Sequence, residues 1–254
     1  MLLAIDIGNT NVTLGVFQGE TLRSTWRLST DVRRMPDEYA VSILNLIPRA
    51  GLELAEITEA AMCSSVPPLM STFEELCLRY FNLRPLIVGA GVKTGVKVLY
   101  DNPREVGPDR IADAAAAFHL YGGPVIVVDC GSATVFDAIS KEGDYLGGAI
   151  APGINMAAEA LFERTARLPR IELVRPKQAI GRNTVASMQS GIILGYVGLI
   201  EGVVQRFKEE LGEGVKVVAT GGFGEIIARE TPVIDLVNTN LTLIGLRMIY
   251  ELNR

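Results

Sequence analysis

The chain has 254 residues, 48% of them hydrophobic, which is enough to bury a large core in one big domain or in two smaller ones. Its formal net charge is -5 at pH 7 and no basic stripe with interleaved aromatic residues occurs, so nucleic acid is not expected as a partner. No signal-peptide pattern occurs and the longest apolar stretch, 191–204, is interrupted by Glu201, so we predict a soluble cytoplasmic protein that does not enter a membrane.

The first strand, expected near residues 2–7, leads into a tight turn and carries one carboxylate, Asp6, to that turn. Gly8 lets the backbone approach a ligand closely, and polar side chains next to it add hydrogen-bond donors. These side chains belong to Asn9, Thr10 and Asn11. Such a turn suits a phosphate, and an aspartate at the strand end suits a cation that neutralises the phosphates. A turn of this kind also occurs in plain hairpins, so one copy alone leaves both interpretations open.

Further elements are expected in the first half, with apolar periods of strands and helices in alternation. They are strands near 12–17 and 21–28, a helix from Pro36, a strand near 59–65, a helix ending near residue 81 and a strand near 84–88. A three-stranded meander followed by alternating strands and helices is typical of a mixed sheet covered by helices.

The segment 89–110 has no regular period until its end and is long for a structureless loop, which usually indicates function. It ends in GPDR, directly before a strongly helical stretch. Asp109 therefore lies in the first turn of a helix, either as a simple cap or as a general base. Arg110 offers a charged fork for a carboxylate or phosphate, or else pairs with Glu105 or Asp113 at the surface.

The pattern of the first hairpin returns as strands near 124–129 and 134–139, joined by a turn within the sequence DCGSAT. Asp129 takes the position of Asp6, Gly131 that of Gly8, and two hydroxyl residues are expected as donors. They are Ser132 and Thr134. Because neither a P-loop nor a protein-kinase glycine-rich loop occurs, phosphate binding is expected from the two hairpins, facing each other across one nucleotide.

The remaining elements repeat the plan of the first half. They are a strand near 145–151, a helix near 153–166, a helix from Thr184 to Leu211, a strand at 215–220, a short helix after Gly222, a strand at 232–236 and a helix near 239–252. The duplication favours two domains. We place them at 1–116 and 117–254, with the closing helix able to pack back on the first.

Three smaller features carry two interpretations each. Asn183 and Thr184 begin the long helix, either as its cap or as ligand donors. Gly221 and Gly222 lie between a strand and a helix, where they either admit a flat adenosine or simply form a tight turn. The three cysteines are odd in number and widely spaced, so buried thiols are expected rather than disulfides or a zinc site. They are Cys63, Cys77 and Cys130.

Five segments together resemble type III pantothenate kinases, over essentially the whole chain. They are DIGNTN at 6–11, GPDR at 107–110, DCGSAT at 129–134, APG at 151–153 and GRNTVASMQSG at 181–191. The resemblance implies an α/β protein of two RNase H-like domains, as in actin-like ATPases, with mixed sheets flanked by helices. It also implies a homodimer that transfers phosphate from ATP to pantothenate, giving 4'-phosphopantothenate in the first step of coenzyme A biosynthesis.

The same resemblance implies roles for individual residues. Asp109 is implied as the general base that takes the pantothenate hydroxyl proton, and Asp129 as a ligand of K⁺ or NH₄⁺, needed alongside Mg²⁺ with ATP. The implied ATP contacts are Asp6, Ile7, Gly8, Asn9, Thr10, Asn11, Val12, Thr13 and Ser132. The implied pantothenate contacts are Tyr100, Gly107, Pro108, Asp109, Arg110 and Thr184, the last reaching in from the partner subunit. Ser132 stands where a threonine often follows the glycine, which keeps the hydroxyl.

Three other functions share the hairpins. A kinase or phosphatase acting on sugars, acetate or polyphosphate should lack GPDR followed by the GRNT helix. A nucleotide-dependent regulator without catalysis could keep ATP binding, although an intact Asp109 speaks against it. An actin-like filament protein should carry an additional polymerisation subdomain, and no such insertion occurs.

Overall fold

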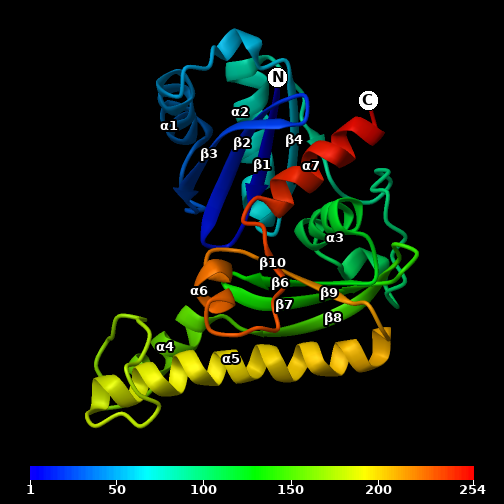
Figure 1. Ribbon diagram of the computed structural model, residues 1–254. Helices are drawn as coiled ribbons and strands as arrows, with labels where there is room; N and C mark the ends of the chain where they lie inside the picture. The colour runs from blue at the N-terminus through cyan, green and yellow to red at the C-terminus, as the bar shows by residue number, and fades with distance from the viewer. The chain divides into compact units, whose positions relative to one another are not determined.

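The computed structural model describes all residues from 1 to 254, and the chain divides into two compact units. Unit 1 comprises Met1–Ala116 together with Asn240–Arg254, and unit 2 comprises Ala117–Thr239. Each unit contains one five-stranded sheet with helices packed on it (Figure 1). The fold is therefore α/β with mixed sheets, as the sequence predicts.

The sheet of unit 1 has the strand order β3-β2-β1-β4-β5. Its strands are β1 Leu2–Ile7, β2 Asn11–Gln18, β3 Thr21–Ser29, β4 Glu59–Ser64 and β5 Leu86–Ile87. The central strand β1 pairs antiparallel with β2 and parallel with β4. Both β1 and β4 are almost entirely buried, which explains why their sequences are nearly continuous apolar runs.

Helices cover both faces of this sheet. They are α1 Pro36–Arg49, α2 Pro67–Phe81, α3 Pro108–Tyr121, whose last residues belong to unit 2, and α7 Leu241–Leu252. On one face α1 and α2 meet where the rings of Tyr39 and Phe73 lie 4.7 Å apart. On the other face α3 and α7 approach very closely, because a Cβ on Gly245 would lie 2.0 Å from the carbonyl oxygen of Ala112. The close approach brings the first turns of α3 onto the face that carries Asp6.

The sheet of unit 2 has the order β10-β9-β6-β7-β8, which repeats the order and directions of unit 1. Its strands are β6 Val125–Cys130, β7 Ala133–Ile139, β8 Tyr145–Pro152, β9 Lys216–Thr220 and β10 Leu236–Val237. The helices are α4 Ile154–Glu163, α5 Thr184–Leu211 and α6 Gly224–Ala228. The repeated order confirms the internal duplication that the sequence indicates.

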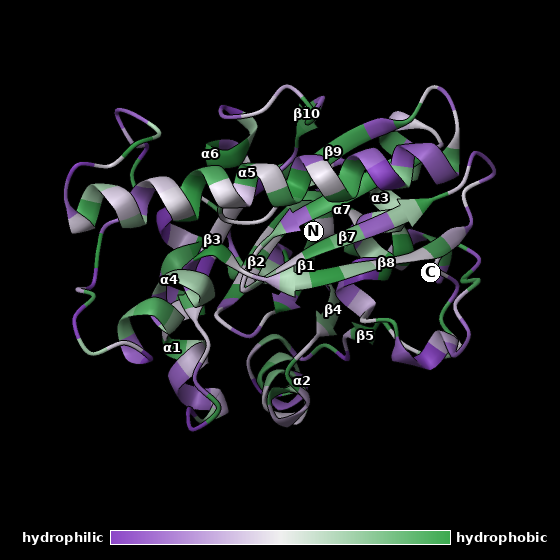
Figure 2. Ribbon diagram, turned by 90° about the horizontal axis from the view of Figure 1, so that it is seen from below, coloured by the Kyte–Doolittle hydropathy of each residue, from purple (hydrophilic) through white to green (hydrophobic).

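The long helix α5 runs along one face of the sheet of unit 2 (Figure 1). Its buried side chains recur at helical spacing and include Met188, Ile192, Tyr196, Ile200 and Val204. Apolar and intermediate colours continue over most of the helix, and strongly hydrophilic residues gather near its C-terminal end (Figure 2). By length and composition α5 could cross a membrane, a criterion that core helices of soluble proteins also meet.

The predicted elements all occur, with shorter bounds at three of them. The strand expected at 84–88 is reduced to β5, and the strand expected at 232–236 lies at β10 instead. Pro85 and Pro232 lie at the starts of these stretches and cannot donate a hydrogen bond to a neighbouring strand. The helix expected to reach residue 166 ends at Glu163.

Candidate functional site

The turn of the first hairpin is held by backbone and hydroxyl contacts. The amide of Gly8 donates to the carbonyl of Asn11 at 3.0 Å, and the Thr30 hydroxyl donates to the Gly8 carbonyl at 2.7 Å. The side chains of Asn9, Thr10 and Asn11 are exposed, as a ligand-binding turn requires. The side chains of Ile7 and Val12 are fully buried, so these two residues can offer a ligand only their backbone.

Ser65, which follows β4, braces the same turn from the neighbouring strand. Its amide and its hydroxyl both donate to the Ile7 carbonyl, at 3.0 and 3.3 Å, and its Oγ accepts from Asn9 Nδ2 at 3.4 Å. The sequence interpretation missed both Ser65 and Thr30. The available signal was their position, since each is a hydroxyl residue directly after a strand that extends the sheet beside β1 or β2.

Asp6 and Cys63 lie opposite each other in the parallel register of β1 and β4. Both side chains therefore point to the same face of the sheet, where α3 and α7 pack. The Cys63 thiol donates to Asp6 Oδ1 across a distance of 3.4 Å. Cys63 is fully buried, whereas Asp6 remains partly exposed at the strand end.

Asp109 lies in the first turn of α3 and is partly exposed. Its Oδ1 accepts from the amide of Arg110 at 2.9 Å, so the carboxylate satisfies one free N–H of the helix start, in agreement with a capping role. The side chain folds back over Gly107, where a Cβ would lie 2.3 Å from Oδ1. The glycine of GPDR is therefore needed for this orientation of the carboxylate.

Three carboxylates of unit 1 lie near the Cys63 thiol. Burial raises the pKa of the Cys63 thiol well above its ordinary value, and the charges of three carboxylates raise it further. These carboxylates belong to Asp6, Asp109 and Asp113. Asp113 is only 4% exposed and lies one helical turn after Asp109, a spacing that places both on one face of α3. The sequence interpretation considered Asp113 only as a surface partner of Arg110.

The loop before α3 contains the other predicted substrate contacts of unit 1. Tyr100 is partly exposed and precedes a short 3-10 helix, Pro103–Glu105, whose N-terminus is capped by Asn102. Asn102 Nδ2 also donates to Glu105 Oε1 at 2.8 Å. The segment that looked irregular in sequence is thus held by local side-chain contacts.

In unit 2, the second hairpin turns more tightly than the first. The amide of Gly131 donates to the carbonyl of Ala133 at 3.1 Å, closing a turn one residue shorter than that of Gly8. A Cβ on Gly221, whose φ is +79°, would lie 2.2 Å from Asp129 Oδ1. A Cβ on Gly153 would lie 2.1 Å from the Ser132 carbonyl oxygen. Two glycine-bearing connections, β9–α6 and β8–α4, therefore enclose this turn.

The prediction that Thr134 donates to a ligand at this turn is wrong. Thr134 is 1% exposed, and its hydroxyl lies 3.5 Å from the Tyr196 hydroxyl on α5. The alternation of side chains along β7 directs Thr134 into the core between the sheet and α5. Ser132, in the turn itself, is exposed.

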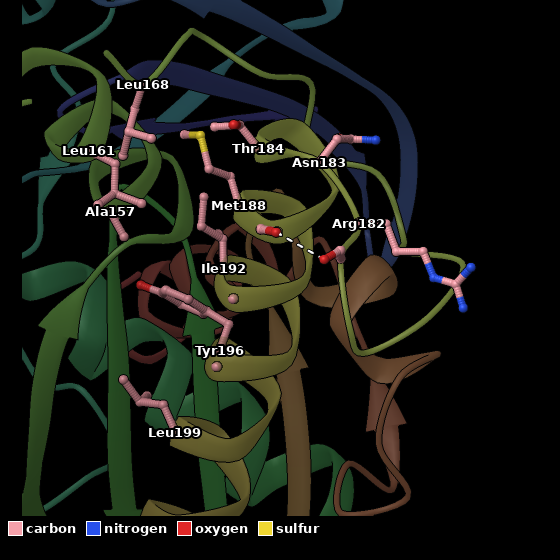
Figure 3. A pocket seen from close by; sticks show the side chains of 14 residues that line it. Ala157, Leu161, Leu168, Arg182, Asn183, Thr184, Met188, Ile192, Tyr196 and Leu199 are labelled. Carbon is pink, nitrogen blue, oxygen red and sulfur yellow. Dashed lines mark hydrogen bonds between the residues drawn. The ribbon is translucent and has the colours of Figure 1, made fainter. Parts of the chain in front are cut away.

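The start of α5 is a capped helix end. Asn183 Oδ1 accepts from the Ala186 amide at 2.8 Å, which confirms the capping interpretation of Asn183. The following turns hold the preceding loop, since Ser187 Oγ donates to the Gly181 carbonyl at 3.3 Å (Figure 3) and Gln189 Nε2 donates to that of Glu172 at 2.9 Å. Polar residues of the GRNTVASMQSG segment thus fix the loop.

A groove of about 910 Å³ lies between α4, the loop that precedes α5 and the side of α5 that faces them. Apolar side chains line most of it, and polar residues stand at one end beside the helix start (Figure 3). The apolar lining includes Leu161, Leu168, Met188, Ile192, Tyr196 and Leu199. Thr184 is exposed at the polar end, where it remains available to a ligand or to another chain.

The prediction for the three cysteines can be judged directly. All three cysteines are free and buried, as predicted, and burial raises the pKa of Cys77 and of Cys130 to about 12. No group of three His, Cys, Asp or Glu side chains is arranged to hold a metal ion.

The similarities to known proteins agree with this site. The family model described as "Type III pantothenate kinase" matches residues 2–206. A type III pantothenate kinase from Dehalococcoides mccartyi (strain BAV1) is 53% identical over 253 residues, covering 100% of this chain and 96% of that protein.

Among solved structures, a conserved putative Baf family transcriptional activator from Campylobacter jejuni has a TM-score of 0.63 at 21% identity, with 99% and 98% of the two chains covered. An activator of 2-hydroxyisocaproyl-CoA dehydratase from Clostridium difficile, with bound ADPNP, has a TM-score of 0.52 at 11% identity, with 99% and 94% covered. These two likenesses show the actin-like ATPase fold. The family match and the full-length identity show more, and the chain belongs to the type III pantothenate kinases, the ATP-dependent enzymes that phosphorylate pantothenate at the first step of coenzyme A biosynthesis.

Proposed function

We propose that Asp109 is the general base that accepts the proton of the pantothenate 4'-hydroxyl as that oxygen attacks the γ-phosphorus of ATP. The product is 4'-phosphopantothenate, and ADP leaves. Phosphoryl transfer depends mainly on positioning and charge neutralisation, and a positioned base adds about 10²–10⁴ in rate.

One observation carries this assignment. The Asp6 carboxylate accepts a hydrogen bond from the buried Cys63 thiol, and α3, which carries Asp109, packs on the same face through Ala112. The charges of both carboxylates raise the pKa of that thiol. A base on α3 and an aspartate of a phosphate-sized turn therefore share one small region. Asp109 is also partly exposed and so accessible to a substrate hydroxyl. Its bond from the Arg110 amide orients one oxygen and leaves the other for proton transfer.

The first hairpin is proposed to bind ATP phosphates through backbone amides and exposed side chains, over the stretch 6–13. Mg²⁺ usually keeps several waters and binds one or two carboxylates together with phosphates. The partly exposed carboxylate of Asp6 and the lack of a three-residue metal cluster fit that mode. In this proposal Asp6 holds the magnesium–nucleotide complex, and Ser132 donates to phosphates from the second hairpin.

Asp129 is proposed to hold the monovalent cation, K⁺ or NH₄⁺. The space that a Cβ of Gly221 would fill adjoins both Asp129 Oδ1, at 2.2 Å, and the Cys130 carbonyl oxygen, at 2.8 Å. Carboxylate and carbonyl oxygens are suitable ligands for a hard cation. When bound, the cation supplies positive charge near the phosphates.

Pantothenate is proposed to contact Tyr100, the stretch 107–110 and Thr184, the last from the partner subunit of a homodimer. The outer side of α5 supports a dimer, because Leu194 is 38% exposed there. A Cβ on Gly191, Gly195 or Gly198 would meet no atom, so another helix could approach closely. We place the enzyme in the cytoplasm, with no nucleic-acid or membrane partner.

The decisive experiment measures phosphopantothenate formed from ATP, Mg²⁺ and pantothenate, with and without K⁺, by wild type and Asp109→Asn. We expect K⁺-dependent product that falls at least about a hundredfold in the variant, because the base is lost. Nucleotide affinity serves as the control for folding and should stay unchanged. A variant that retains wild-type turnover would refute the base assignment. Turnover of a sugar, acetate or polyphosphate in preference to pantothenate would favour the other kinases of this fold.

A further inference from the structure

We propose that Cys63 is a positioning residue for the nucleotide site: its thiol hydrogen bond to Oδ1 fixes the orientation in which the Asp6 carboxylate meets the magnesium–nucleotide complex. This inference rests on the proposed role of Asp6 in ATP binding. Cys63 itself does not touch substrate.

The position of the thiol is set by the sheet. Cys63 faces Asp6 in the parallel pairing of β1 and β4, so the two Cβ atoms stand side by side on the same face. Cys63 is 0% exposed and belongs to the cluster that includes Ala4 and Ala61 beneath α7. A side chain packed in this way keeps one orientation. The Sγ therefore presents its proton to Asp6 Oδ1, 3.4 Å away.

The charges around the thiol explain why a neutral donor is useful at this position. Asp6, Asp109 and Asp113 all lie close enough to act on Cys63. Repulsion among these carboxylates would favour turning Asp6 away from the other two. A hydrogen bond from a small neutral donor opposes that rotation without cancelling the negative charge that a cation needs.

A purely structural role for Cys63 makes the opposite prediction. If the thiol only filled space among apolar side chains, valine would replace it well, whereas serine would bury a more polar group. If the thiol orients Asp6, serine would preserve the donor and valine would remove it. Which of the two variants binds the nucleotide more tightly therefore separates the two roles.

The test compares Cys63→Ser and Cys63→Val with the matched pair Cys77→Ser and Cys77→Val. Cys77 is an equally buried thiol on α2, on the other side of the sheet, where it contacts no aspartate of the hairpin. The readouts are the affinity for magnesium–AMPPNP by calorimetry and the KM values for ATP and pantothenate. Thermal unfolding of each variant checks that it is folded.

We expect Cys63→Val to weaken magnesium–AMPPNP binding and to raise the KM for ATP about fivefold, the effect of losing one modest hydrogen bond. Cys63→Ser should stay within about twofold of wild type, and the KM for pantothenate should change in neither. The Cys77 variants should leave nucleotide affinity unchanged. If Cys63→Val fails to fold, Cys63→Ala, which also lacks the donor, takes its place.

The inference is overturned if Cys63→Val binds magnesium–AMPPNP as tightly as wild type, or if Cys63→Ser binds it more weakly than Cys63→Val. Failure of the proposed function looks different. A wild type that binds magnesium–AMPPNP but forms no phosphopantothenate refutes the kinase mechanism and still allows the two variants to be ranked by affinity. A wild type that does not bind magnesium–AMPPNP overturns both.

Discussion

The two hairpins share a strand order and an aspartate at the same position, but their turns are stabilised differently. In unit 1, side chains from neighbouring strands brace the turn, with Thr30 bonded to Gly8 and Ser65 bonded to Ile7. In unit 2, backbone packs directly against the turn at Gly153 and Gly221. The duplication therefore preserved the architecture and the carboxylate, while different contacts hold the two turns.

The helices that follow the two sheets, α3 and α7, differ in the residues of their first turns. The helix α3 carries Asp109 in its first turn, on the face of β1 and β4 that bears Asp6. Its counterpart after the second sheet, α7, has no acidic residue in its first turn and belongs to unit 1. Within unit 1, the first hairpin therefore has a second carboxylate, from α3, on its face of the sheet. In our proposal the two halves have different roles. Unit 1 supplies the general base and binds magnesium, and unit 2 binds the monovalent cation.

The largest expected effect tests the difference in how tightly backbone packs against the two hairpin turns. Gly221→Ala should destabilise unit 2 by about 3 kcal/mol, because its Cβ would overlap Asp129 at a positive φ. Gly222→Ala is the control, since nothing lies within 4 Å of its Cβ position. Gly8→Ala, with its nearest atom at 3.1 Å, should cost about 1 kcal/mol. Urea unfolding measures all three, and equal losses at Gly221 and Gly8 would contradict the contrast.

The next prediction distinguishes Asp6 from Asp129 by the cation that each is proposed to bind. Asp129→Asn should abolish the stimulation by K⁺, whereas Asp6→Asn should raise the Mg²⁺ concentration needed for half-maximal activity. Each variant should lose at least about tenfold in kcat/KM for ATP, the size of one interaction with a charged group. Initial rates over a matrix of K⁺ and Mg²⁺ concentrations provide the measurement. An Asp6→Asn enzyme that loses only its K⁺ response would show that the assignments are reversed.

Both halves should lose stability at alkaline pH, because each contains a thiol whose pKa burial raises from 9.0 to about 12, Cys77 in unit 1 and Cys130 in unit 2. Unit 1 also contains Cys63, whose pKa burial raises well above its ordinary value, so its loss should be the larger. A thiol that stays protonated when folded but ionises when unfolded favours unfolding as pH rises above 9. Its stabilisation is fully present below pH 9 and is lost toward pH 12, by about 1.4 kcal/mol per pH unit.

Urea unfolding at pH 8 and pH 10 measures this loss. Cys77→Val and Cys130→Ala should each lose about 1 kcal/mol less than wild type between the two pH values, because one titrating group is gone. Parallel losses in wild type and both variants would mean that these thiols do not control alkaline stability.

The smallest effect concerns the brace of the first turn. Ser65→Ala removes the hydroxyl bonded to the Ile7 carbonyl and should raise the KM for ATP about threefold, because the turn loses one modest hydrogen bond. Ser64→Ala is the matched control, since the Ser64 hydroxyl bonds Val66 at the start of α2. It should change stability without changing the KM for ATP. The reverse pattern would place the important hydroxyl at residue 64.

Much of the fold could be predicted because its signals are local. Apolar strands such as β1 and β6, short glycine turns, and the helix starts at Pro36 and Asn183 follow from nearby residue types. The error at Thr134 arose because a hydroxyl beside a turn looks the same whether it faces a ligand or the core. Ser65 and Thr30 were missed because their partners are 58 and 22 residues away along the chain.

By itself, the sequence determined the duplicated α/β plan, the two aspartate turns, the family and the placement of Asp109 at a helix start. Only the tertiary structure decided which side chains meet. The parallel register of β1 and β4 puts a thiol against Asp6, and the close approach of Gly245 to Ala112 packs α7 against α3 on that same face. Such contacts join residues far apart in the chain. They depend on strand register and helix spacing, which sequence periodicity does not specify.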